Sequence, residues 1–338
     1  MRQIRLARAV CFAAPATRAS YVNQPRVGQT YRLRHVWPTR TSSARHSSCP
    51  RTPLPNIWLA LPHLQVGRNV PFMHDNSPLP QSDRPTSTAA GHWVLARAGK
   101  RVLRPGGLQL TKRMLTAAGI PGSQVVEFAP GLGRTAQLIV DSGVASYTGV
   151  DLDPAAVKRV ESIVAPHGGV VVNRKAQETG LADEVADVVV GEAMLTMQGA
   201  KTKAAIAAEA FRILRPGGRY AIHEMGLTPD DIAPTLADEL RKRLAQTIRV
   251  NARPLTQSEW RQVLTAAGFE VEWVDTAPMA LLSVRRNLAD EGVRGVARIA
   301  RNVLRDKELR ARVLQMRATF KEYQDHMCGI AIVARKPA

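Results

Sequence analysis

Two acidic residues and a glycine loop in the middle of the chain stand where they could hold a charged ligand. In VVEFAPGLGR, residues 125–134, apolar residues surround Glu127, and a glycine loop then opens a predicted helix. A second acid, Asp151, ends the next predicted strand in TGVDLD. A glycine loop between a strand and a helix lets the backbone approach a ligand closely, at the helix end that favours negative charge. The pattern therefore predicts a cofactor site.

The identity of the cofactor depends on the acids more than on the glycines. A dinucleotide loop reads G-x-G-x-x-G, but here Ala129 takes the first glycine position, Gly131 and Gly133 follow, and Ala136 takes the third. The acid two residues before this loop would repel a pyrophosphate and would suit an ammonium or sulfonium group. Asp151 can accept both hydroxyl hydrogens of a ribose. Two acids without a phosphate-binding lysine indicate a cationic nucleoside.

The surrounding elements predict an α/β fold. Strands are expected at QVVEF, SYTGVDL, GVVVNRK, ADVVVGEAM, RYAIHE, FEVEWVDTA and CGIAIVAR, and helical segments separate most of them. The first helix should end at Gly119 before Pro121, and another should open at Asp153 and Pro154. Strands joined by helices of this length predict a doubly wound, mainly parallel sheet that is covered on both faces. The last strand is expected to pair antiparallel at or near an edge.

Helices that follow the sheet core are predicted from capping patterns and from an apolar stripe. Capping boxes are expected at Thr228 with Asp231 and at Thr256 with Glu259. A long helical region is predicted over residues 290–324. Its second half carries an apolar stripe with alternating spacings of four and three, made of Leu309, Val313, Met316, Phe320 and Tyr323. Considered by themselves, the segments 227–264 and 290–324 are interpreted as cover for the core.

The motif resembles that of the class I S-adenosylmethionine-dependent methyltransferases, roughly over residues 110–224 and more loosely to residue 336. That family has an acid, one residue and then G-x-G-x-G at the end of its first strand, matched by Glu127, Ala129, Gly131 and Gly133. Its second acid matches Asp151. The resemblance implies a Rossmann-like, mainly parallel seven-stranded sheet with an antiparallel last strand and appended helices. It also implies S-adenosyl-L-methionine as the cofactor, and an acceptor pocket or lid formed by the segments 227–264 and 290–324.

Three details of the cofactor site follow from the same resemblance. Leu152 is expected to lie against the adenine. An Asp-Ala pair that often reads the adenine edge is replaced by Ala176 and Gln177, which leaves this contact to the Gln177 amide or to the backbone. Ala129 stands where the family usually has glycine, and its methyl group predicts an ordinary negative φ. A positive φ there would mean that this register is wrong.

Candidates for a catalytic base lie at the ends of the fourth and fifth predicted strands. Glu192 in VVGEAM is one, with a cofactor-contacting or helix-capping role as the alternative. His223 and Glu224 in AIHEMG are the others, and a buried, hydrogen-bonded strand histidine is the alternative for His223. We predict substrate-side roles for His223 and Glu224. No metal site is predicted.

Motifs that are absent narrow the acceptor. GEAM stands where methyltransferases that act on nucleobase amino groups carry D/N-P-P-Y/F, and there is no Pro-Cys pair of the cytosine-C5 type. Arsenite methylation needs several cysteines, but only Cys328 lies outside the N-terminal stretch, which holds Cys11 and Cys49. Transfer of a methyl group to a small molecule is therefore the leading hypothesis. An RNA methyltransferase that uses the basic N-terminus and a non-catalytic S-adenosylmethionine-binding module are the alternatives.

The N-terminal stretch carries much of the positive charge. No acid precedes Asp75, and this stretch holds eleven arginines, Arg2, Arg5, Arg8, Arg18, Arg26, Arg32, Arg34, Arg40, Arg45, Arg51 and Arg68. Without these, 36 of the 47 basic residues face 28 acids, so the net charge of +19 falls to +8. The stretch is interpreted as a disordered extension over residues 1–85 with Met73 as a candidate start, or else as a transit peptide or nucleic-acid-binding arm.

The remaining residues, 86–338, are expected to form one methyltransferase domain, with helical cover at about 227–264 and 285–325. The small number of cysteines suits a reducing compartment. No apolar run approaches the ~20 residues that cross a bilayer. A cytoplasmic location is expected, or import into an organelle if the N-terminus is a transit peptide.

Overall fold

The computed structural model describes residue 79 and residues 83–279 and 281–338. The prediction of a disordered extension therefore falls almost entirely outside the described residues. One mixed sheet contains β1 (Gln124–Phe128), β2 (Ser146–Asp151), β3 (Val170–Asn173), β4 (Ala186–Glu192), β5 (Leu214–Leu227), β7 (Glu270–Pro278) and β8 (Met327–Arg335). Their order is β3-β2-β1-β4-β5-β8-β7, and the short β6 (Leu255–Thr256) pairs with β5 off this path.

The predicted fold is confirmed. Strands β1 to β5 are parallel, and β8 runs antiparallel between β5 and β7, one strand in from the edge. The chain returns to this inner position because β5 is long enough to pair with β8 over its whole second half, from Arg219 to Leu227. The carboxyl ends of the parallel strands thus share one edge of the sheet, and a switch in strand order beside β1 makes this edge a ligand site in open α/β sheets.

Alternating side chains of the central strands bury both faces of the sheet. Val125 of β1 and Val188 of β4 face the helices α2 (Gly107–Ala118), α3 (Arg134–Asp141) and α4 (Pro154–Val164). Val126 and Val189 face α5 (Ala200–Ile213) and α7 (Gln257–Ala266) on the other side. This two-residue period is what a strand requires when both of its faces lie in a core.

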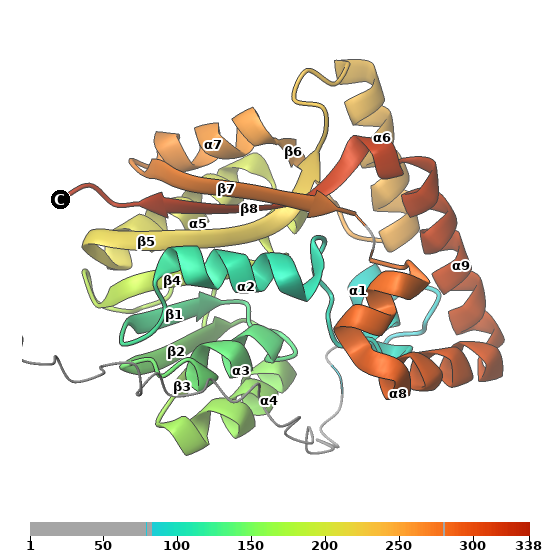
Figure 1. Ribbon diagram of the computed structural model, residues 1–338, viewed down its shortest axis with the longest axis horizontal. Coiled ribbons are helices and arrows are strands. Elements are labelled where there is room, and N and C mark those ends of the chain that lie inside the picture. Colours follow the sequence, from blue (N-terminus) through green and yellow to red (C-terminus); the bar gives the residue numbers. More distant parts are fainter. Residues whose placement is uncertain (1–78, 80–82, 280) are drawn as a thin grey trace, which may run out of the picture. The chain divides into compact units, whose positions relative to one another are not determined.

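A separate group of helices stands beyond the carboxyl ends of the strands. Figure 1 shows α1 (Gly91–Arg97), α6 (Pro234–Ile248), α8 (Val284–Arg305) and α9 (Lys307–Glu322) gathered at that end. They form a third apolar cluster with the last residues of β5. The predicted stripe is confirmed, since Leu309, Met316, Phe320 and Tyr323 are buried and Val313 packs against them in part. Short 3-10 turns, Ala165–His167, Leu195–Met197 and Gln324–His326, complete the elements.

Two predictions about helix starts have opposite outcomes. The capping box at Thr256 is confirmed, because its hydroxyl accepts from the Glu259 backbone while the Glu259 carboxylate accepts from the Thr256 N–H. The box at Thr228 is wrong, because α6 begins only at Pro234. A residue before proline disfavours the helical region, so Ala233 stays extended and the helix starts on the proline itself. The long helical region is likewise broken, at Asp306, whose carboxylate caps α9 at the Leu309 N–H.

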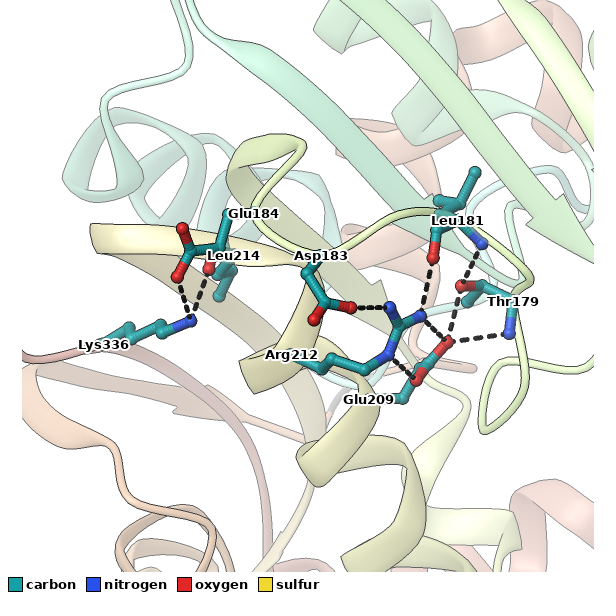
Figure 2. A network of polar contacts seen from close by, with 8 residues as sticks. All are labelled: Thr179, Leu181, Asp183, Glu184, Glu209, Arg212, Leu214 and Lys336. Atoms are coloured by element: carbon teal, nitrogen blue, oxygen red, sulfur yellow. Dashed lines mark hydrogen bonds and ion pairs between the residues drawn. The ribbon is translucent and has the colours of Figure 1, made fainter.

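A network of polar contacts anchors the segment between β3 and β4 (Figure 2). The Glu209 carboxylate on α5 accepts from the backbone N–H and the hydroxyl of Thr179, at 2.9 and 2.6 Å, and pairs with Arg212. Arg212 also donates to Asp183 and to the Leu181 carbonyl. Hydrogen bonds from Arg212 lower the pKa of Glu209 to about 2, so the pair stays ionised at neutral pH. The segment that carries Gln177 is therefore tied to the body of the domain.

No helix in the described residues is both long enough and apolar enough to span a membrane.

The loop before α2 reaches the sheet edge through a close contact between two glycines. A Cβ added at Gly329 on β8 would overlap the backbone N and Cα of Gly106. Glycine at both positions lets the loop that carries Arg104 lie directly on β8 and β5. The contact matters for the site because Arg104 extends from this loop into the cavity described below.

We predict that Gly329→Ala lowers the free energy of unfolding by about 3 kcal/mol or more, because one of the two backbones must move. Gly199→Ala is the control, since Gly199 has open space around its Cβ position and should change stability by less than about 1 kcal/mol. Urea denaturation measures both. If both substitutions change the free energy of unfolding by the same small amount, the loop that carries Gly106 can move at little cost in stability.

Candidate functional site

A cavity of about 260 Å³ opens at the carboxyl edge of the sheet. Its walls include four of the predicted site residues from the ends of β1, β2 and β4, namely Glu127, Ala129, Asp151 and Glu192, together with Gly131 of the glycine loop. These residues are up to 65 positions apart in the sequence, and the parallel strand order brings them together. The fold therefore brings the two acids and the glycine loop together, as predicted.

The glycine loop follows the predicted path with one correction. Ala129 has a φ of +52°, so the expected negative φ is wrong. Its N–H still continues the pairing with β2 by donating to the Val150 carbonyl at 2.8 Å, and the chain must turn sharply at once after that bond. Gly131 and Gly133 follow with φ of +56° and +73°. The tight turn imposes the left-handed conformation whichever residue stands there.

The register of the motif is supported independently of that angle. The Gly131 N–H donates to Asp151 Oδ2 at 3.0 Å, which links the loop after β1 to the end of β2. Asp151 Oδ1 accepts from the Asp153 N–H at 2.9 Å. The carboxylate is thus fixed in orientation, is only 8% exposed, and keeps acceptor capacity toward the cavity. Each carboxylate oxygen has two lone pairs, so two ligand hydroxyls can still be bound.

Glu127 lies deeper than Asp151. It is 2% exposed, and its carboxylate accepts a hydrogen bond from the Tyr147 hydroxyl of β2 at 2.7 Å. Burial raises the pKa of Glu127 to about 8, because one hydrogen bond does not replace the lost water. Glu127 is therefore largely protonated at neutral pH, and a cation bound beside it would favour the ionised form.

Glu192 is buried like Glu127, but its surroundings differ. Arg104 approaches its Oε2 at 3.1 Å, and Thr135 also donates to Oε2. Oε1 accepts from the Thr111 hydroxyl at 2.5 Å and lies 3.0 Å from Nδ1 of His223. Burial alone would raise the pKa of Glu192, but the charge of Arg104 and these hydrogen bonds outweigh it and lower the pKa to about 2.

The positions of the protons in this network follow from its donors. The backbone N–H of Gly106 donates to Nε2 of His223 at 3.0 Å, so Nε2 carries no hydrogen. The ring hydrogen is then on Nδ1, where it points to Glu192. The Thr111 hydroxyl accepts a hydrogen bond from Arg104 at 2.9 Å and donates one to Glu192. All four acceptor sites of Glu192 are occupied, which suits the carboxylate to holding Arg104 and poorly to removing a proton.

The other two predicted catalytic residues lie outside the cavity wall. His223 is 0% exposed, with both ring nitrogens engaged as described. Glu224 is also 0% exposed, and its carboxylate accepts from the backbone N–H groups of Met194, Leu195 and Thr196 and from the Thr196 hydroxyl. Burial raises the pKa of Glu224 against these four donors. Glu224 shapes the turn after β4, whose residues do line the cavity.

The predicted adenine contacts are also off the cavity wall. Leu152 is 65% exposed, and Gln177 is exposed beside the inward-facing Ala176. Gly133 directly precedes α3 as its N-cap, with Ile163 of α4 packed where a Cβ would stand. Contacts of these three residues with a cofactor stay predictions.

Sequence reasoning missed Arg104 on the cavity wall and Thr111 behind it. Arg104 and Thr111 connect to Glu192 only through the path of the chain around α2. Arg104 lies in the first of two LRPGG strings, and the second, at 214–218, begins β5 at the opposite edge. Nothing in the local string distinguishes the two. A polar threonine on the buried face of a helix was the one available signal for Thr111, which is 0% exposed.

The donor set of the cavity suits S-adenosylmethionine. Two carboxyl groups stand beside a glycine loop, one with free acceptor sites for hydroxyls and one buried with a raised pKa that a positive charge would lower. The start of α3 has no side-chain cap, which leaves its N–H groups to a ligand carboxylate. In the described residues no cluster of three or more His, Cys, Asp or Glu is arranged to hold a metal ion.

Comparison with known proteins agrees with this fit. Residues 126–222 match a family model described as a methyltransferase domain. An uncharacterized protein of Haemophilus influenzae is 32% identical over 251 residues, which cover 73% of this chain and 98% of that protein. An arsenite methyltransferase of Halobacterium salinarum is 30% identical over 172 residues, but these are 48% of this chain and only 40% of that protein.

Similarity to solved structures concerns the fold. Phosphoethanolamine N-methyltransferase 2 of Haemonchus contortus was solved with phosphomonomethylethanolamine and S-adenosylhomocysteine. It shares 14% identity and a TM-score of 0.57, over 76% of this chain and 59% of that chain. The helical arrangement beyond the sheet edge must be interpreted from this chain's own residues.

We predict that Ala129→Gly raises the free energy of unfolding by about 0.5–1 kcal/mol, because an L-residue at positive φ is strained by about 1–2 kcal/mol and glycine is not. Ala136→Gly in α3 is the control and should cost about 1 kcal/mol or more, since it only loosens a helix. Denaturant titration with matched m-values checks both. A loss of stability in Ala129→Gly would mean that the methyl group's packing outweighs the strain.

Proposed function

We propose, on the premise that this chain belongs to the class I S-adenosylmethionine-dependent methyltransferases, that it transfers the methyl group to a small-molecule acceptor. The observation that carries the proposal is the cavity itself. Its acidic side lies on the sheet edge, and its other side is walled by the chain's own helices α1, α6 and α9. A half-open pocket of about 260 Å³ with these two walls suits a small molecule rather than a nucleic acid strand.

Asp151, Glu127 and the glycine loop are the residues that we propose to hold the cofactor. When bound, S-adenosylmethionine supplies a methyl group on a positively charged sulfur. Asp151 would bind the ribose hydroxyls, and the Glu127 carboxyl group would lie on the side of the positive charge. The low pKa of Glu192 keeps a further negative charge at the cavity wall at all physiological pH values.

We interpret His223, Glu224 and Glu192 as positioning residues rather than as the base. Glu192 and His223 hold Arg104 and the loop at Gly106 against the cavity, and Glu224 holds the turn that carries Met194. The protein's contribution to the reaction is then mainly orientation of the two reactants in the pocket, an effect that can reach roughly 7–11 kcal/mol.

We expect Asp151→Ala to weaken the binding of S-adenosylhomocysteine by roughly 100-fold or more, since hydrogen bonds to a charged group contribute about 1.5–3 kcal/mol each. Asp153→Asn is the matched control, because it removes a charge two residues away while the amide can still cap α4. Isothermal calorimetry measures the affinity of both variants for S-adenosylhomocysteine. Unchanged affinity in Asp151→Ala would contradict the proposed role of Asp151 in binding the cofactor.

A deletion of residues 1–72 separates the small-molecule proposal from an RNA methyltransferase. The shortened chain should bind S-adenosylhomocysteine as tightly as the full chain does. Activity or RNA binding that disappears with the deletion would favour a nucleic-acid substrate instead.

Glu127 should make cofactor affinity depend on pH. Its pKa in the folded protein is about 8, well above the ordinary value of 4.5. The unliganded protein therefore keeps a proton there between pH 4.5 and 8, and Glu127 contributes stability that is complete below pH 4.5 and is lost as pH rises through 8. Binding of a cation should release this proton, so affinity should rise with pH and level off above about 8.

Calorimetry of S-adenosylmethionine binding at pH 6.5, in two buffers of different ionisation enthalpy, measures this proton release. We expect close to one proton for the wild type and close to none for Glu127→Gln, which keeps an acceptor for Tyr147. The same proton release in both proteins would show that another group is responsible.

A further inference from the structure

Methionine side chains dominate the part of the cavity that the acidic groups do not line. Five of the nine methionines in the chain line it: Met194, Met197, Met225, Met279 and Met316. They come from the turn after β4, the end of β5, the segment after β7, and α9. We call these five residues the methionine wall. Methionine is flexible and polarizable, and it adapts to the shape of apolar partners.

Three residues of the methionine wall belong to one continuous apolar region, whereas Met194 packs in the core cluster of the sheet. Met225, Met279 and Met316 pack in one buried cluster with Leu95 of α1 and Phe320 of α9, which also line the cavity. Glu127 and Asp151 are not part of this cluster. The cavity therefore has two sides: one carries the charged groups, and the other is apolar and is formed by the helical cover together with the turn after β4 and the end of β5.

Charged groups are confined to the first side. The charged residues of the cavity wall lie in the loop before α2, at the ends of β1, β2 and β4, and at the start of α3: Arg101, Arg104, Glu127, Arg134, Asp151 and Glu192. On the apolar side, the Thr196 hydroxyl is engaged by the Glu224 carboxylate and the Met225 N–H. His92 of α1 remains as an ionisable group there, and burial lowers its pKa to about 4, so that it is neutral at pH 7.

We propose that the methyl acceptor is an uncharged, largely apolar molecule whose body lies against the methionine wall, with His92 available to a single neutral polar group such as a hydroxyl. This inference rests on the proposed function. A charged acceptor such as an amine or a phosphate ester would lose its water on the apolar side without gaining a partner of opposite charge there, and burial of an unpaired charge is strongly unfavourable. An apolar body loses no such hydration and gains contacts with flexible thioethers.

Methionine methyl groups provide a direct readout. We would label the full chain with carbon-13 at its methionine methyls, saturate it with S-adenosylhomocysteine, and titrate it with 1-naphthol and with phosphoethanolamine. Resonances of the methionine wall should shift in a saturable way with 1-naphthol, while those of Met114 of α2 and Met327 on β8 should stay in place. Binding of 1-naphthol should be at least 10-fold tighter than that of phosphoethanolamine. Shifts caused by phosphoethanolamine alone, or by neither probe, would overturn the proposal.

The same samples separate this proposal from the one on which it rests. S-Adenosylhomocysteine binding is measured by calorimetry before either probe is added. If it binds and 1-naphthol does not, the apolar acceptor is wrong and the methyltransferase proposal stands. If S-adenosylhomocysteine itself does not bind to the folded chain, the proposed function fails.

A charge placed on the methionine wall tests the location of the acceptor. Met197 is half-buried, so Met197→Glu should fold, and it should weaken 1-naphthol binding at least 10-fold with S-adenosylhomocysteine affinity within about 3-fold of the wild type. Met197→Leu keeps the apolar surface and should bind 1-naphthol normally. Leu314→Glu on the exposed side of α9 controls for added charge, since Leu314 is 53% exposed. Unchanged 1-naphthol affinity in Met197→Glu would place the probe elsewhere and overturn the proposal.

Discussion

The buried ion pair between Arg104 and Glu192 connects four elements at the sheet edge. Glu192 ends β4, Arg104 precedes α2, and the pair is completed by Thr111 of α2 and His223 of β5. Both charged side chains are almost fully buried. Removal of one partner of a buried pair costs about 3–5 kcal/mol because the other charge is left without compensation. The loop before α2 is therefore held against the cavity by electrostatics as well as by the contact between Gly106 and Gly329.

Three buried carboxyl groups near this edge illustrate how neighbours decide what a glutamate does. Glu192 faces a cation and three other donors, and its pKa falls to about 2. Glu224 has four uncharged donors, and burial still raises its pKa. Glu127 has one hydrogen bond, from Tyr147, and its pKa rises to about 8. A full positive charge thus outweighs several dipoles in a dry site, and Glu127 is the carboxyl group whose charge a cationic ligand can change most.

The helical cover packs on the core and also lines the pocket, so it combines the two roles that were considered from the sequence. Met316 and Phe320 pack within the third apolar cluster, and the same residues line the cavity. The cover therefore closes the core and also provides the surface toward which an acceptor would face. The charged residues of the cavity wall come from the loop before α2, from the ends of β1, β2 and β4 and from the start of α3, and none of them comes from α1, α6 or α9.

The sequence alone was enough to predict the fold and the placement of Glu127, Asp151 and the glycine loop at one edge of the sheet. Strand period, helix caps such as Asp153, and the placement of Glu127 and Asp151 at strand ends are local properties, and parallel topology brings strand ends together without further information. The roles of His223 and Glu224 could not be inferred in this way, because they depend on which N–H groups reach their side chains from loops distant in the sequence. The φ of Ala129 and the partnership of Arg104 with Glu192 were likewise decided by tertiary structure. A turn angle and a buried ion pair are set by what surrounds them, and that surrounding exists only once the chain has folded.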